Sequence, residues 1–223
     1  MNKNKICFIT CVNDERAYDE CIYYINQLNI PKGVDIEKIC IKDASSMAHG
    51  YNNAMNSTDA KYKVYLHQDT LIINKDFIYD FINIFNQDKN IGMIGFVGSK
   101  LIPHDAIWWN SNIISGKVYD NSSGIMEKYE FDEIENIFDE VKCIDGFIMI
   151  TQYDIDWQED IFDGWHFYDI SQSIEFIKKG YKVVVPKQNT PWGIHDCGIV
   201  ITSNGYEDYR IKFLEKYNLY LNK

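Results

Sequence analysis

Several features that assign a protein to a well-known class are missing from this chain of 223 residues. No apolar run is long enough to span a membrane, and the first ten residues, MNKNKICFIT, lack the long apolar stretch of a secretion signal. The sequence also has no internal repeat, no linker and no low-complexity tract. We therefore expect a single domain over residues 1–223 that is located in the cytoplasm, with peripheral attachment at the inner membrane face as an open alternative.

Basic side chains are scarce. The chain has 22 Lys and Arg residues against 33 Asp and Glu residues, which gives a formal net charge of −11. This balance argues against nucleic acid as a partner, because the phosphate backbone is bound mainly by Lys and Arg. A small phosphorylated ligand would need local help from a cation, from helix N-termini or from a few lysines.

The sequence contains no Cys-x-x-Cys pair. Its six cysteines, several of which lie in apolar runs such as KICFITC, occupy positions 7, 11, 21, 40, 143 and 197. We interpret them as reduced, mostly buried thiols, as is typical of a cytoplasmic protein.

Apolar and aromatic residues, in contrast, are plentiful. They make up 46% and 15% of the chain, which is enough for a sizeable core. The 16 Tyr and five Trp residues are also suited to a sugar- or base-binding site, although packing in the core and on the surface explains their number equally well.

Strand-like and helix-like segments alternate along the first half of the chain. Apolar runs predict strands over 5–12, 34–42, 61–67 and 91–98, and helical spacing predicts helices over 14–28, 44–57 and 74–88. The second half is less regular, with predicted strands over 140–151 and 181–186, predicted helices over 170–180 and 206–221, and an irregular stretch over 99–130. This order predicts an α/β fold with a mostly parallel central sheet flanked by helices.

Polar residues follow each of the first three predicted strands, over 10–14, 43–46 and 67–70. In parallel α/β sheets, ligands bind beyond the carboxyl ends of the strands. These three stretches are therefore the first candidates for a ligand site.

The third stretch, VYLHQDT (64–70), ends an apolar run on an imidazole and a carboxylate. Side chains two positions apart on an extended segment point the same way, so His67 and Asp69 face one direction if the strand continues that far. Manganese accepts both nitrogen and oxygen ligands, which makes this pair a candidate metal site. A plain polar loop is the alternative.

Two later loops carry further candidates. In DGWHFYD (163–169), Asp169 lies at the start of a predicted helix, where it is either a general base for a sugar hydroxyl or simply the helix N-cap. In WGIHDCG (192–198), His195 is either a third metal ligand or a solvated loop histidine.

Taken in order, the strand over 5–12, Asp43, Asn52, YKVYLHQD, DGF, DGWHFYD and IHD resemble a GT-A glycosyltransferase of the broad family-2-like group. More narrowly, they resemble bacterial glycosyltransferase-like families in which the metal motif D-x-D reads HQD. The resemblance covers about residues 5–198. It implies the GT-A fold, with a nucleotide-sugar-binding half over 1–98 and an acceptor-binding half over 99–223 that includes the C-terminal helix.

The resemblance also implies donor-binding roles for particular residues. Thr10 would lie beside the nucleotide base, and Asp43 would recognise the base or ribose. Asn52 would match the asparagine of the family's RN-x-G helix, although its flanking sequence, YNNA, lacks the arginine and the glycine.

In the same resemblance, the HQD segment binds the donor diphosphate. Asp69 matches the second aspartate of D-x-D and would bind Mn²⁺, or Mg²⁺, together with His195. His67 replaces the first aspartate, and Gln68 lies between them in the donor site.

GWHFYD resembles the GWG-x-ED loop of β-1,4-galactosyltransferase-like enzymes, in which the last aspartate is the catalytic base; here that residue is Asp169. Tyr168 replaces the glutamate before it. The acceptor-binding residues that the resemblance implies are Asp145, Gly146, Asp163, Trp165, His166 and Tyr168.

The function expected from this resemblance is metal-dependent, inverting transfer of a hexosyl or N-acetylhexosaminyl group from a nucleotide sugar, with a UDP sugar as the expected donor. The acceptor would be a glycan, a lipid-linked saccharide or a protein, as in polysaccharide biosynthesis. Two alternatives stay open: a non-catalytic module that binds a sugar nucleotide or glycan, and a metal-dependent hydrolase or nucleotidyltransferase built on His67, Asp69, His166 and His195.

Overall fold

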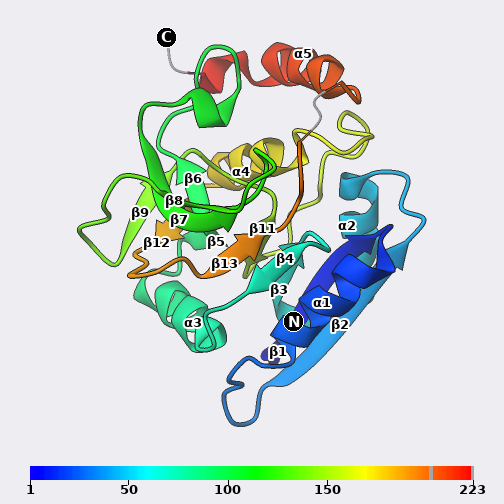
Figure 1. The fold of residues 1–223 in the computed structure, drawn as a ribbon, viewed down its shortest axis with the longest axis vertical. Coiled ribbons are helices and arrows are strands. Elements are labelled where there is room, and N and C mark those ends of the chain that lie inside the picture. Colours follow the sequence, from blue (N-terminus) through cyan, green and yellow to red (C-terminus); the bar gives the residue numbers. More distant parts are fainter. Residues whose placement is uncertain (201–202, 222–223) are drawn as a thin grey trace.

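The computed structural model of the protein describes residues 1–200 and 203–221 (Figure 1). Its central sheet consists, in spatial order, of β2 (Asp35–Lys42), β1 (Asn2–Val12), β3 (Ala60–Leu66), β11 (Ile148–Thr151), β5 (Ile91–Gly95), β12 (Lys182–Pro186) and β9 (Phe138–Val141). Only β11 and β9 run antiparallel to the other strands of this sheet. The predicted α/β class with a mostly parallel central sheet is confirmed.

A second sheet lies against the first and supplies half of the site described below. Its spatial order is β10 (Cys143–Ile144), β6 (Val97–Ser99), β7 (Ile114–Asp120), β13 (Gly193–His195) and β4 (Thr70–Ile72), with β8 (Glu127–Glu130) paired to β7. β4 begins directly after the HQD segment, and β13 ends on His195. This sheet therefore brings two distant parts of the sequence together.

Helices cover both faces of the central sheet, so its inner strands β3, β11 and β5 are buried on both sides. Phe8 and Val64 pack in one core cluster with α1 (Glu15–Ile25) and α3 (Phe77–Gln87). Ile9 and Tyr65, one position further along their strands, pack in a second cluster with α2 (Met47–Ser57) and α4 (Tyr168–Lys178). This alternation follows from the two-residue period of a strand.

The C-terminal helix α5 (Tyr206–Tyr217) lies at the top of Figure 1, and its Phe213 packs against Phe162 and Phe167 from the loop before α4. Two short 3₁₀ helices, η1 (Trp108–Asn110) and η2 (Asn218–Tyr220), complete the elements. Within residues 1–200 and 203–221, no helix combines the length and the apolar character that crossing a membrane requires. All six cysteines are free thiols, and four of them are buried, as predicted.

The prediction of one continuous strand over 140–151 is wrong. The segment is divided into β9, β10 and β11, and the break before β11 falls at Asp145 and Gly146. The Asp145 carboxylate accepts a hydrogen bond from the backbone N–H of Phe147, 3.1 Å away, a local turn that competes with strand pairing. The predicted strand over 91–98 is similarly divided into β5 and β6, which pair in different sheets.

The stretches predicted to be irregular also contain strands. Residues 99–130 include the antiparallel pair of β7 and β8, and the loop over 190–198 includes β13. β8 has the sequence EKYE and is largely exposed. It therefore lacks the alternation of apolar and polar residues by which a strand is recognised in a sequence.

Gly116 in β7 offers a test of how closely β7 and β6 approach each other within the second sheet. Its φ is +112°, and a Cβ there would clash with the backbone carbonyl oxygen of Phe96, which cannot move without disturbing β6. We expect Gly116→Ala to lower the free energy of unfolding by at least about 3 kcal/mol, measured by urea denaturation.

Gly180→Ala is the matched control for this variant. Gly180 also has a positive φ, +85°, but an added Cβ meets nothing within 4 Å in the described part of the chain. It should cost only the left-handed backbone penalty of about 1–2 kcal/mol. Equal losses in the two variants would show that the close approach at Phe96 is unimportant.

Candidate active site

The HQD segment forms a tight turn directly after β3. β3 ends at Leu66, and the Thr70 N–H donates to the His67 carbonyl over 3.3 Å. The strand therefore does not continue to Asp69, and His67 and Asp69 do not face one direction by strand geometry. The turn nevertheless brings the His67 Nδ1 atom to 3.9 Å from the Asp69 Oδ1 atom.

His195 joins these two residues from the far end of the sequence. β13 pairs antiparallel with β4, which places His195 opposite Thr70. The His195 Nε2 atom lies 3.7 Å from Asp69 Oδ1 and 3.3 Å from His67 Nδ1. The structure thus brings the candidate metal pair, His67 and Asp69, together with His195, the possible third ligand. We call these three residues the trio.

The trio has the composition and geometry of a divalent metal site. Its ligand atoms all lie within 4.8 Å of one another. Asp69 Oδ1 is buried and has no hydrogen-bond partner among the described residues, which is costly for a carboxylate oxygen unless a cation neutralises it. Two imidazole nitrogens and one carboxylate oxygen fit a transition metal such as manganese better than magnesium, which prefers oxygen ligands.

Further hydrogen bonds orient both imidazoles toward this point. The Tyr168 hydroxyl is bonded to His67 Nε2 and lies 3.3 Å from the Gly146 carbonyl, to which it donates. The hydroxyl can then accept from His67 Nε2–H. The unprotonated Nδ1 atom of His67 faces the other two members of the trio, Asp69 and His195. His195 Nδ1–H donates to Asp120 Oδ2 over 2.9 Å, which turns Nε2 inward. Such outer hydrogen bonds are a regular feature of metal-binding histidines.

Asp120 is a site residue that the sequence does not reveal. It ends β7 in VYDNSSG, a segment without a recognisable motif, and the parallel pairing of β13 with β7 aligns it with His195. Asp120, His195 and Cys197 form a second close group of metal-ligating atoms on the outer side of His195. No local pattern could have found Asp120, because a register between distant strands places it.

The charges around the two histidines differ. Burial lowers the pKa of His67, an effect that the Asp69 charge offsets only in part, so His67 is neutral near pH 7. Burial acts in the same direction on His195. The hydrogen bond to Asp120 and the charges of Asp145 and Asp69 outweigh it, however, and the pKa of His195 is raised well above its ordinary value. Without a metal, His67 is therefore neutral near pH 7, whereas His195 carries a proton that Asp120 stabilises.

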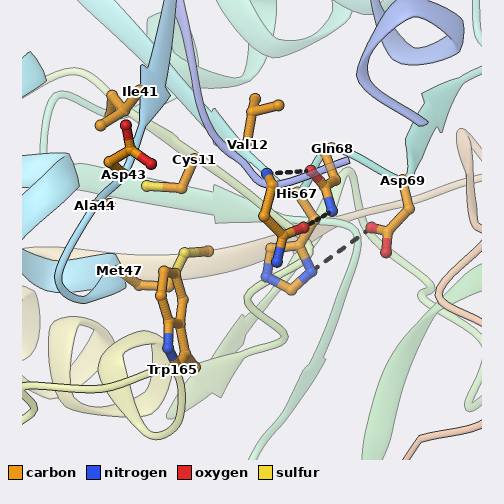
Figure 2. A pocket seen from close by; sticks show the side chains of 11 residues that line it. Cys11, Val12, Ile41, Asp43, Ala44, Met47, His67, Gln68, Asp69 and Trp165 are labelled. Atoms are coloured by element: carbon orange, nitrogen blue, oxygen red, sulfur yellow. Dashed lines mark hydrogen bonds and ion pairs between the residues drawn. The ribbon is translucent and has the colours of Figure 1, made fainter. Parts of the chain in front are cut away.

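A cavity of about 400 Å³ opens on one side of the trio, beyond the carboxyl ends of β1, β2 and β3 (Figure 2). Its lining includes Cys11, Asn13, Asp43, Met47, His67, Gln68, Asp69 and Trp165. In Figure 2, Asp43 and Asp69 lie on opposite sides of the lining, and His67 lies between them. Asp43 is exposed with a φ of +58°, and such strained backbone is frequent at functional sites.

The structure places some of the predicted donor-binding residues in the cavity and others outside it. Asp43, His67, Gln68 and Asp69 all line this cavity. The Gln68 side chain, however, accepts from the backbone N–H groups of Asn13 and Asp14, both at 2.8 Å, so it holds the loop after β1 in place.

Thr10 and Asn52 are not brought into the cavity. Thr10 is buried within β1, two residues before its end, and Cys11, Val12 and Asn13 take the lining position instead. Asn52 is buried, and its amide bonds both the N–H and the carbonyl of Trp157 at 2.8 and 3.0 Å. These two hydrogen bonds hold the loop that contains Trp157 against α2.

A second cavity of about 260 Å³ meets the first at His67, Asp69 and Trp165. Of the predicted acceptor-binding residues, it is lined by Asp145, Gly146, Trp165, His166 and Tyr168, and also by Asp169. Asp163 does not line it; this residue is exposed and forms an ion pair of 2.8 Å with Lys212. The trio thus stands at the junction of two cavities.

Asp169 is not the N-cap of α4. That position belongs to Phe167, whose side chain makes no cap hydrogen bond, and Asp169 is the second residue of the helix. Its Oδ2 atom instead accepts from the backbone N–H of Gly146, 3.1 Å away. Burial and then the Asp145 charge raise the pKa of Asp169 to about 7, although three backbone hydrogen bonds act in the opposite direction. Burial also raises the pKa of Asp145.

Comparison with protein families identifies the chain. A model described as "Glycosyltransferase like family" matches residues 7–217, and the chain belongs to this family. No curated protein sequence matches it.

Solved structures share the fold at low sequence identity. The mannosyltransferase PcManGT from Pyrobaculum calidifontis, in complex with GDP-Man and Mn²⁺, has a TM-score of 0.56 at 11% identity, over 95% of this chain and 61% of its own. Residues 1–349 of TarS from S. aureus, in complex with UDP, have a TM-score of 0.52 at 12% identity, over 94% of this chain and 65% of their own. GalNAc-T7 with UDP, GalNAc and Mn²⁺ has a TM-score of 0.63 at 7% identity, over 96% of this chain and 48% of its own.

These likenesses show that the chain has the GT-A fold. The chain spans between about half and two thirds of the length of the three proteins. These matches establish the family and the fold of the chain.

The raised pKa of Asp169 has a consequence for stability. Between its ordinary value of 3.8 and about 7, the folded protein holds a proton on this carboxyl that the unfolded chain has released. The contribution of Asp169 to stability therefore falls as the pH rises through this window. We expect Asp169→Asn to raise the melting temperature of the metal-free protein, and the gain should be larger at pH 8 than at pH 5.

Asp163→Asn is the matched control. The hydrogen bond to Lys212 lowers the pKa of the exposed Asp163, so its removal should cause a small loss at both pH values. A pH-independent difference between Asp169→Asn and the unmodified protein would contradict the raised pKa.

Proposed function

We propose that the protein is a metal-dependent, inverting glycosyltransferase that uses a nucleotide sugar, with a UDP sugar as the donor. One observation carries this proposal: two cavities meet at His67 and Asp69 of the trio, and His195 and a half-buried carboxylate, Asp169, line only the smaller of them. Group transfer between two bound partners requires this arrangement, because donor and acceptor must meet at one point from separate sites.

The larger cavity is the proposed donor site. It lies beyond the carboxyl ends of β1, β2 and β3, where α/β sheets bind ligands, and Asp43 offers a carboxylate to the base or ribose. The complexes of the similar structures, with GDP-Man, UDP, or UDP and GalNAc, support a nucleotide donor. The transferred group would be a hexosyl or N-acetylhexosaminyl residue.

The trio would hold Mn²⁺, with Mg²⁺ as a weaker substitute. The buried, unpartnered Asp69 Oδ1 atom and the Mn²⁺ in two of the similar structures support this assignment. When bound, the metal supplies the positive charge that stabilises the departing nucleoside diphosphate. Asp120 and Tyr168 would hold the two imidazoles in the required orientation.

Asp169 is the proposed general base on the acceptor side. A pKa of about 7 keeps a good share of the group ionised near neutral pH while leaving it basic enough to take a proton from an acceptor hydroxyl. The Gly146 N–H holds the Oδ2 atom in place, and Asp169 lines the cavity in which an acceptor hydroxyl would lie. A single base opposite the leaving group is what a direct, inverting displacement needs.

The origin of the lining residues supports a single domain with two functional halves. All the residues of the donor cavity except Trp165 come from 1–98. All the residues of the acceptor cavity except His67 and Asp69 come from 99–223.

The two alternatives are less well supported. A hydrolase or nucleotidyltransferase centre would include His166, but this residue is bonded to Asn204 and belongs to neither metal-ligating group of the described residues. A binding module without catalysis would have no use for a carboxylate held at a pKa of about 7 beside the trio. We retain a cytoplasmic role in polysaccharide biosynthesis as part of the proposal.

The metal assignment can be tested by thermal shift with UDP in the presence of Mn²⁺ or of EDTA. Because a ligand that binds only the folded state raises the melting temperature, UDP with Mn²⁺ should stabilise the protein more than UDP with EDTA. Asp69→Ala and His195→Ala should each abolish this Mn²⁺-dependent increment. His104→Ala, which removes an exposed histidine, should keep it. A Mn²⁺-dependent increment that survives in both trio variants would place the metal elsewhere.

The base assignment can be tested by comparing transfer with donor binding. Asp169→Asn should reduce transfer by roughly 10²-fold or more, because a general base is lost, while the Kd for UDP with Mn²⁺ stays within about twofold. Asp163→Asn should change neither quantity. Transfer by Asp169→Asn near the unmodified rate would mean that another group takes the proton.

A further inference from the structure

The acceptor cavity contains no lysine or arginine in its lining, as far as the described residues go. It contains three carboxylates instead, those of Asp69, Asp145 and Asp169. The positive charges of this lining are already paired: His195 is bonded to Asp120 and lies 3.7 Å from Asp69, and the proposed metal at the trio would face the donor diphosphate. An acceptor that carries a phosphate or a carboxylate into the cavity would then meet Asp145 and Asp169 without a free cation beside them. The cavity therefore selects against anionic groups.

The basic and imidazole groups around the cavity are already occupied. The Arg210 guanidinium, one turn along α5 from the cavity wall, is held by Glu207 at 2.7 Å and by the Asp105 carbonyl at 2.9 Å. Lys212 is paired with Asp163. The His166 ring is bonded to Asn204 at 2.7 Å, and the imidazoles of the trio face Asp69.

One polar group of the wall is unused. The Tyr206 hydroxyl is buried, belongs to a residue that lines the cavity, and has no hydrogen-bond partner among the described residues. Tyr206 is the first residue of α5, and the charge of Asp169 acts on its hydroxyl. A buried hydroxyl without a partner is costly, so a bound ligand is expected to supply the missing hydrogen bond.

An aromatic wall flanks this hydroxyl. The Trp109 ring lies 5.7 Å from the Tyr206 ring and is 47% exposed, although the residue lines the cavity. The His166 ring lies 5.3 Å from Tyr206 on another side. A half-exposed indole next to a free hydroxyl offers an apolar face and a polar contact, the combination that a sugar ring needs.

We propose that the acceptor cavity binds an uncharged terminal sugar residue, which stacks on Trp109 and hydrogen-bonds to the Tyr206 hydroxyl. This inference rests on the proposed function and narrows its acceptor to a neutral glycan end. The cavity of about 260 Å³ lies just below the range of roughly 300–1,000 Å³ for drug-sized ligands, which suits one sugar unit. Tyr206 acts here as a binding residue beside the proposed base.

The inference can be tested by binding the intact protein, with UDP and Mn²⁺, to an array of neutral and anionic glycans. The anionic set should carry phosphate, sulfate, uronic acid or sialic acid at the non-reducing end. We expect retention only on glycans with neutral ends. Retention on anionic ends would overturn the inference, and so would an array without any retained neutral glycan, which would indicate a peptide or another acceptor.

Variants of the wall distinguish a specific site from general adhesion. With the best neutral glycan in solution, Tyr206→Phe should weaken binding roughly 2- to 10-fold, as expected for one hydrogen bond, and Trp109→Ala should weaken it by roughly 10-fold. Tyr220→Phe, in η2 and outside the cavity, is the matched control and should bind normally. Unchanged binding in both wall variants would overturn the assignment.

The thermal shift with UDP and Mn²⁺ separates this inference from the proposed function. A protein that responds to UDP and Mn²⁺ but retains only anionic glycans, or none, keeps the proposed function and loses the inference. A protein that responds to neither nucleotide nor Mn²⁺ loses the proposed function, and the inference falls with it.

Discussion

The site depends on one buried carboxylate oxygen that has no hydrogen-bond partner within residues 1–200 and 203–221. Asp69 Oδ1 lies 3.9 Å from a nitrogen of His67 and 3.7 Å from a nitrogen of His195, in surroundings that favour positive charge. An arrangement of this kind is unfavourable on its own, so the fold must hold it in place. It does so with a tight turn after β3, with the register between β13 and β4, and with the hydrogen bonds that the imidazoles of His67 and His195 donate to Tyr168 and Asp120.

The same features that hold the trio also divide the space around it. The break between β10 and β11 places Asp145 and Gly146 beside α4, where the Gly146 N–H holds Asp169 and the Gly146 carbonyl holds Tyr168. Trp165, in the loop before α4, lines both cavities. A single interruption of a strand therefore links the metal-ligating residues, the proposed base and the boundary between the proposed donor and acceptor sites.

The negative net charge of the chain is consistent with separate donor and acceptor sites that meet at the trio. A protein with few basic side chains cannot bind a diphosphate by lysine and arginine alone, and here a metal held by the trio is the proposed answer. On the acceptor side, burial and then the charge of Asp145 raise the pKa of Asp169. The charge of Asp145 would also disfavour an anionic acceptor, so proton transfer and acceptor selection would have this one carboxylate in common.

The sequence by itself determined the elements and the motifs. Strand–helix alternation in the first half, the residues of HQD, the Gly-Trp loop with Asp169, and His195 were all readable because they depend on local spacing and residue type. Only the tertiary structure decided which residues face the site. Asp120 and Tyr206 have no local signal, because a register between strands and the packing of α5 place them. Thr10 and Asn52 fall outside the cavity for the same reason: the direction of a side chain follows from its neighbours in space, which local sequence does not encode.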